Sequence, residues 1–209
     1  MKPTTKSLLA LALVAAASGV ASAQGYYGNA GQNPRLPGGF HDRQGRMIFG
    51  FSLGLGGMSA SGEDLECANC DYSPLAGQAS GHLGGFIGPR LALMGEIQGN
   101  VQTLAVDAYG DSEMLVQSAL LFAAQYWVTP QLWIKGGLGF SNLRVDHTYY
   151  GTVAEVPENG VAVMGAIGYE LLSAQRFSVD LQGRLINGSY DSVGENVSSG
   201  SIGIGINWF

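Results

Sequence analysis

The most constraining feature of this sequence is a two-residue alternation in which charge is confined to one phase. In long segments after residue 45, Leu, Ile, Val, Phe, Met, Ala or Gly occupies every second position. Successive side chains of a β-strand point to opposite faces, so such a segment has one apolar face. The charged residues in the interior of these segments, beyond the first and last positions, share the other phase, and they are Glu96, Lys135, Glu170, Asp180 and Arg184.

The uncharged phase indicates a sheet whose apolar face meets lipid. A charge on a lipid-facing strand near the bilayer midplane costs about 2–4 kcal/mol, so its absence from every strand is informative. A soluble barrel would instead turn its apolar phase inward. Because only helices and closed barrels satisfy their backbone hydrogen bonds within a bilayer, the sequence predicts an all-β, antiparallel, up-and-down transmembrane β-barrel.

The N-terminus has the three parts of a secretory signal. Lys2 and Lys6 are followed by an apolar stretch over residues 7–20 and a small-residue cleavage site that ends at Ala23. The apolar stretch is too short for a membrane anchor. We therefore expect a signal peptide over residues 1–23, whose cleavage accompanies export.

Composition agrees with one membrane barrel domain. Charged residues are 12% of the chain, about half of the roughly 25% that is usual in soluble proteins. The sequence contains 33 glycines. After residue 20, no stretch is long and apolar enough for a membrane helix. Residues 24–45 lack periodicity and predict a flexible leader, which leaves residues 46–209 for the barrel.

Eight strands are predicted, joined by links that alternate between long and short. The short links predict periplasmic turns and the long ones outer loops, with both termini on the inner side. The strands are predicted over residues 46–58, 78–87, 91–102, 114–128, 131–143, 161–172, 176–187 and 199–209. The long links are residues 59–77, 103–113, 144–160 and 188–198, and the short links are residues 88–90, 129–130 and 173–175.

The final segment of the last predicted strand, residues 202–209, ends on an aromatic residue. Here the sequence resembles small eight-stranded outer-membrane barrels of the OmpA/OmpX type, in the outer membrane protein β-barrel domain family of Gram-negative bacteria. The resemblance implies an outer-membrane lipid environment. It also implies that Trp208 and Phe209 belong to the signal read by the barrel assembly machinery. Because the apolar phase falls on Trp208, Phe209 is out of step, and a terminal bulge or frayed end would reconcile the two.

The inward phase predicts a polar network in the lumen. Its members are Glu96, Lys135, Glu170, Asp180, Arg184 and His82. Buried charges must pair or meet water, which allows either an ion-pair plug or a narrow porin-like conduit. Inward glycines favour the conduit by leaving room for water. They are Gly50, Gly54, Gly56, Gly84, Gly137, Gly139, Gly168, Gly203 and Gly205.

Two further patterns contain residue types that can carry chemistry. Cys67 and Cys70 lie in the first long loop of an exported chain, and we expect a loop disulfide. No second ligand pair supports a metal site, so neither a metal nor a cofactor is predicted. Ser80, His82 and Glu96 allow a weak lipid-hydrolase hypothesis, but the first two lie about 7 Å apart along one face. No catalytic residue is assigned.

The sequence also has a charge difference between the two sides of the predicted membrane. The four long loops contain twelve Asp and Glu residues against Arg144 alone, whereas the leader and short turns are mainly basic. An acidic outer end attracts divalent cations or cationic surface partners, although charge also serves loop solubility. The net charge of −6 argues against nucleic-acid binding. These features favour a structural or surface-interaction role, with a small-solute channel as the alternative.

Overall fold

The computed structural model describes residues 40–60, 63–64, 75–106, 112–149, 152–174, 176–190 and 195–209. The predicted signal peptide, most of the leader, and Cys67 and Cys70 lie outside these ranges. The described elements are strands: β1 (Met47–Ala60), β2 (Glu63–Asp64), β3 (Ala76–Phe86), β4 (Leu91–Val106), β5 (Ser112–Trp127), β6 (Leu132–Tyr149), β7 (Thr152–Ser173), β8 (Phe177–Tyr190) and β9 (Glu195–Trp208).

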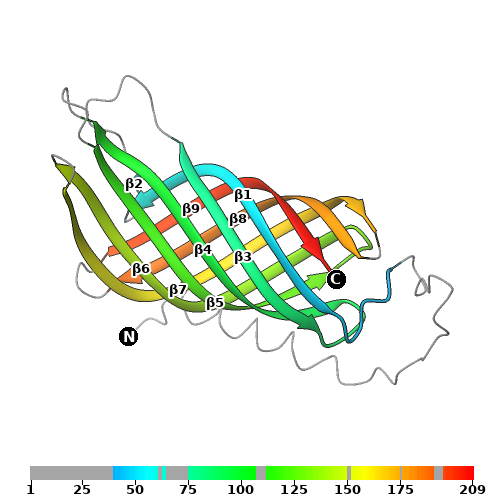
Figure 1. The fold of residues 1–209 in the computed structure, drawn as a ribbon. Coiled ribbons are helices and arrows are strands. Elements are labelled where there is room, and N and C mark those ends of the chain that lie inside the picture. The colour runs from blue at the N-terminus through cyan, green and yellow to red at the C-terminus, as the bar shows by residue number, and fades with distance from the viewer. Residues whose placement is uncertain are drawn as a thin grey trace.

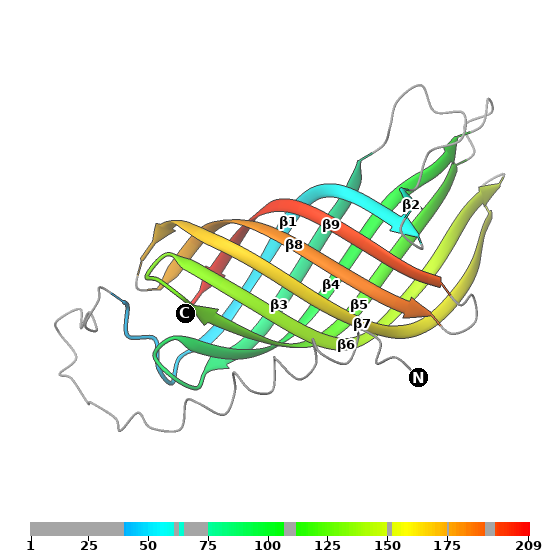
Figure 2. The same ribbon diagram turned by 180° about the vertical axis from the view of Figure 1, so that it is seen from behind.

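The strands close into the predicted antiparallel barrel (Figure 1 and Figure 2). Apart from the two-residue β2, which pairs with the end of β1, each strand pairs with the next in sequence. The circle closes where β1 pairs with β9, from Phe49 opposite Trp208 to Ala60 opposite Val197. The eight-stranded, up-and-down fold class is therefore confirmed.

The barrel has two different ends. At the turn end, residues 87–90, 128–131 and 174–176 connect neighbouring strands, close to the three predicted short links. In the turn over residues 128–131, the Thr129 hydroxyl accepts a hydrogen bond from the backbone N–H of Leu132 at 2.9 Å. The opposite end, where the predicted outer loops lie, is called the loop end below. The C-terminus and the start of β1 both lie at the turn end (Figure 1).

The predicted apolar phase covers the outer surface. Leu53, Ile97, Leu138 and Leu185 are each more than 60% exposed, although a soluble fold would bury such side chains. Aromatic side chains gather on the outside near the turn end, where the rings of Phe49 and Trp208 stack with centroids 5.2 Å apart. An apolar band bordered by aromatic residues is the surface that a membrane barrel presents to lipid.

Several strands are longer than predicted at the loop end. The expected loop over residues 144–160 is largely strand, because β6 continues to Tyr149 and β7 begins at Thr152. Similarly, β8 continues to Tyr190 and β9 begins at Glu195. The paired ends of β6 and β7 project from the barrel (Figure 2). Polar residues occupy both phases there, so hydrophobic alternation no longer marks the strand.

No helix within the described ranges is long and apolar enough to cross a membrane.

Candidate functional site in the barrel lumen

A charge-balanced set of side chains lies in the lumen. Three acids and three bases are buried there, and none is more than 6% exposed. They are Glu96, Glu170 and Asp180, and Arg43, Lys135 and Arg184. Five of these six were predicted from the strand phase. Arg43 was missed, although the predicted set had an acid in excess and thereby indicated a missing cation.

The middle of the lumen holds an ion-paired triad. Glu96 on β4 accepts Lys135 Nζ from β6 at 3.0 Å and is also bound by Arg184 from β8. Arg184 additionally donates to the hydroxyl of Ser80, which lies 2.7 Å from the Ser52 hydroxyl. Charges taken out of water are tolerated when paired and hydrogen-bonded, so the triad ties opposite walls of the barrel together.

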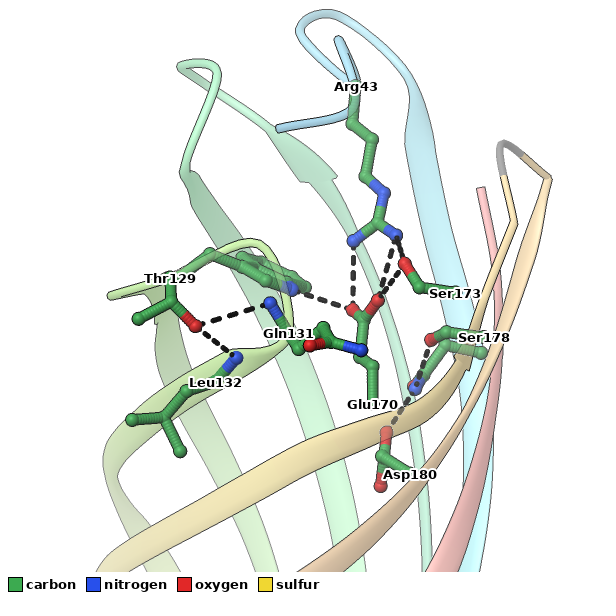
Figure 3. A network of polar contacts seen from close by, with 10 residues as sticks. Arg43, Thr129, Gln131, Leu132, Glu170, Ser173, Ser178 and Asp180 are labelled. Atoms are coloured by element: carbon green, nitrogen blue, oxygen red, sulfur yellow. Dashed lines mark hydrogen bonds and ion pairs between the residues drawn. The ribbon is translucent and has the colours of Figure 1, made fainter. Parts of the chain in front are cut away.

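The Asp180 carboxylate is hydrogen-bonded to a neutral partner. Asn207 Nδ2 on β9 donates to Asp180 Oδ2 at 2.6 Å and to the Ser178 hydroxyl at 3.3 Å (Figure 3). Gly205 on β9 is paired with Asp180 on β8, and a Cβ added to Gly205 would lie 2.6 Å from Asp180 Oδ1. This glycine therefore makes room for a carboxylate.

Other inward glycines likewise accommodate protein atoms. A Cβ on Gly168 would lie 2.2 Å from the Trp133 ring, and one on Gly54 would lie 2.9 Å from Gln78 Oε1. At Gly56, Gly84, Gly139 and Gly203 it would meet the neighbouring strand's backbone oxygen at distances between 1.7 and 2.2 Å. The expectation that inward glycines leave room for water is wrong at these positions, because rings, amides and backbone occupy the space.

At the turn end, Arg43 reaches into the lumen and binds Glu170 with both of its terminal nitrogens (Figure 3). The Nη1–Oε1 and Nη2–Oε2 distances are 3.0 and 3.1 Å. Trp127 Nε1 donates to the same carboxylate at 2.7 Å, and the hydroxyl of Ser173 also donates to it. A paired Arg–carboxylate fork with additional donors is among the stronger hydrogen-bond arrangements in proteins.

A β-bulge directly after Glu170 brings Ser173 to the same side of the strand. The register between β7 and β8 shifts between Glu170 and Leu172, so Leu171 and Leu172 both face outward, 55% and 60% exposed. Glu170 and Ser173 consequently point to the same interior site. A bulge re-aims side chains in this way without ending the strand.

The chain terminus completes the turn end. The β8–β9 register is regular up to Phe177 opposite Trp208, and the Phe209 N–H donates to the Arg176 carbonyl at 2.9 Å. Trp208 therefore faces outward and Phe209 inward, beside Trp127 at a centroid distance of 6.5 Å. The terminal bulge or frayed end considered from the sequence is wrong, because Phe209 simply continues the alternation.

Neutral groups occupy the lumen at the loop end. Gln117 Nε2 donates to the Tyr190 hydroxyl and to the Val197 carbonyl, each at 3.1 Å. The Tyr190 hydroxyl lies 2.6 Å from the Ser141 hydroxyl. The Tyr190 side chain also belongs to an apolar cluster, whose members are Met58, Ala76, Leu115, Leu143, Tyr190 and Val197.

The structure does not assemble the residues of the hydrolase hypothesis into a catalytic arrangement. His82 and Glu96 are paired positions of β3 and β4, as expected for inward-facing neighbours. However, the Glu96 carboxylate is engaged by Lys135 and Arg184, and the Ser80 hydroxyl contacts Ser52 and Arg184. A serine nucleophile would need a base within hydrogen-bond reach.

Part of the predicted acidic outer end can be located. The side chains of Glu113, Asp146 and Glu158 lie on the strand extensions at the loop end, and Arg144 Nε lies 3.4 Å from Asp146 Oδ1. In the part of the chain that the structure describes, no three His, Cys, Asp or Glu side chains gather to hold a metal ion.

No protein-family model and no curated protein matches the sequence. The attachment invasion locus protein Ail of Yersinia pestis, in complex with the heparin analogue sucrose octasulfate, aligns with a TM-score of 0.55 at 10% identity, over 79% of this chain and 99% of Ail. Neisserial surface protein A aligns with a TM-score of 0.52 at 13% identity, over 78% of this chain and 96% of that protein. The fold is that of the small outer-membrane barrels.

Proposed function

We propose that this protein is an exported barrel of the bacterial outer membrane with a structural or surface-interaction role. The observation that carries the proposal is the filled, charge-balanced lumen, whose six charged side chains are all at most 6% exposed. With the interior engaged in its own contacts, the groups left for partners are those of the loop end. The apolar outer surface supports a membrane location.

The acidic loops favour a cationic partner at the loop end. Divalent cations, cationic peptides or a basic protein surface would gain from that potential, whereas polyanions would be repelled. Ail was crystallised with a polysulfated heparin analogue. The four predicted outer loops of this chain contain twelve acids and one Arg or Lys residue, Arg144. We therefore expect this chain to bind polysulfated ligands poorly.

A binding comparison tests the surface role. Folded protein in lipid nanodiscs should bind an oligolysine peptide more strongly than heparin, and the binding should weaken with added salt. The matched variant carries Glu113→Gln, Asp146→Asn and Glu158→Gln, which should reduce oligolysine binding without altering the fold. Equal binding by both proteins would remove the surface role and leave the structural one.

Labelling tests the location and orientation. A Cys introduced by Asp191→Cys should react with an impermeant reagent on intact cells, and one introduced by Arg176→Cys should not. The reverse pattern would contradict the orientation.

We also propose that the barrel assembly machinery reads Trp208 and Phe209 before the barrel closes, because Phe209 packs inside the folded barrel.

A narrow channel is the second candidate, supported by lumen atoms that lack protein partners. These include His82 Nε2, both polar atoms of the Gln125 side chain, and Asp180 Oδ1. Buried polar atoms of this kind commonly bind internal water. Planar-bilayer recordings separate the candidates: stable silence excludes a channel, and resolved open steps would contradict a purely structural lumen.

We assign no enzymatic activity to the barrel. Lipid release from vesicles should be the same for the native protein and for Ser80→Ala, since the Ser80 hydroxyl is already engaged by Arg184. A loss of release in the variant would revive the hydrolase hypothesis.

A further inference from the structure

We propose that the turn end of the lumen is a preformed guanidinium-binding site, which Arg43 of the chain's own leader occupies. The site consists of the Glu170 carboxylate, the Ser173 hydroxyl, and the rings of Trp127 and Phe209. Its ligand class is the guanidinium group of an arginine side chain. This inference is independent of the loop-end role, because it concerns the opposite end of the barrel.

The site matches the shape of a guanidinium rather than only its charge. Two nitrogens of Arg43 meet two oxygens of Glu170 in a parallel fork, a geometry that a lysine ammonium cannot provide. The Arg43 Cζ also lies 3.7 Å from the Phe209 ring centroid and 5.4 Å from that of Trp127. Planar cations bind aromatic faces at these distances, most strongly when water is excluded.

The barrel holds the acceptor in place without help from Arg43. Trp127 Nε1 donates to Glu170 Oε1 and the Ser173 hydroxyl donates to Oε2, so two strands fix the carboxylate. The Glu170 backbone N–H is bound to the Gln131 carbonyl at 2.8 Å. Phe86 supports the aromatic wall, with its centroid 5.1 Å from that of Trp127 and 5.8 Å from that of Phe209. Removing the Arg43 side chain should therefore leave an open site and not a collapsed one.

A tight turn delivers Arg43 to the site. The Arg46 N–H donates to the Arg43 carbonyl at 3.1 Å, and Gly45 has a φ of 74°, in the left-handed region. Asp42 Oδ1 accepts the Gln44 N–H at 3.2 Å and supports the same turn. The turn reverses the chain before β1, so that Arg43 points into the lumen with 3% of its surface exposed.

Chemical rescue tests the site. Arg43→Ala should lower the thermal midpoint of the folded barrel in detergent, measured by heat-modifiable gel migration and tryptophan fluorescence. Methylguanidinium at millimolar concentration should restore at least half of the loss in a saturable manner. Methylammonium at the same ionic strength should not. The native protein, whose site is filled, should show neither response.

Two further variants separate the site from general salt effects. Arg176→Ala removes an exposed guanidinium from the same end of the barrel and should show no rescue. Glu170→Gln combined with Arg43→Ala should abolish rescue because the charged fork acceptor is gone. If Arg43→Ala fails to fold, methylguanidinium added during refolding should recover the yield. Absence of saturable rescue in both formats, or equal rescue by methylammonium, would overturn the proposal.

Discussion

The two ends of the barrel lumen contain different kinds of contact. At the turn end a buried ion pair, Arg43 with Glu170, is enclosed by aromatic rings. At the loop end neutral amides and hydroxyls around Tyr190 are combined with an apolar cluster. Removing one partner of a buried ion pair leaves an uncompensated charge, whereas removing one partner of a neutral hydrogen bond leaves a single unpaired polar group. The two ends should therefore differ in how much stability one substitution removes.

The largest effect is expected from Glu170→Gln. It leaves the Arg43 guanidinium buried without its counter-charge, and breaking such a pair costs about 3–5 kcal/mol. Urea unfolding in lipid vesicles, followed by tryptophan fluorescence, measures the loss. The double variant with Arg43→Ala should lose less than Glu170→Gln alone. A double variant that loses the sum of both single losses would mean that the pair is not coupled.

The second-largest loss of stability is expected at the loop end, from a substitution that adds side-chain volume. In Gly188→Ala the new Cβ would lie 2.5 Å from the Tyr190 hydroxyl, and overpacking of this kind costs about 1–3 kcal/mol. Gly57→Ala is the matched control, because its Cβ would meet nothing within 4 Å. Equal unfolding midpoints for the two variants would show that Tyr190 does not rest on this glycine.

A smaller effect is expected from Tyr190→Phe. The ring remains, while the hydroxyl that accepts from Gln117 and meets Ser141 is lost. Gln117 Nε2 keeps its bond to the Val197 carbonyl, so we expect a loss of about 1 kcal/mol. A loss as large as that of Glu170→Gln, in the same urea assay, would contradict the contrast between charged and neutral closure.

The smallest effect is expected for the partly exposed pair of Arg144 and Asp146. Its side chains are 40% and 21% exposed, and pairs of this kind contribute below about 1 kcal/mol. Arg144→Ala should shift the urea midpoint slightly at low salt and not at high salt. The Arg43–Glu170 pair should show much less salt dependence, and equal dependence would indicate that water reaches the turn end.

The strands and lumen charges could be predicted because lipid imposes a strict alternation on the chain. Each of the charges Glu96, Lys135 and Arg184 had to face inward, which the structure confirms. Arg43 could not be placed in the same way, because it precedes β1 and its partner lies 127 positions away. The strand extensions at the loop end were missed because solvent on both faces removes the hydrophobic pattern.

The contact between Arg43 and the Phe209 ring has a topological consequence. The two described ends of the chain lie side by side, with the guanidinium carbon 3.7 Å from the terminal ring. The order of the strands along the chain can therefore be changed without changing which strands are neighbours in the barrel. A short linker could join residue 209 to residue 40, with new termini opened between β4 and β5. Such a circular permutant should keep every strand pairing.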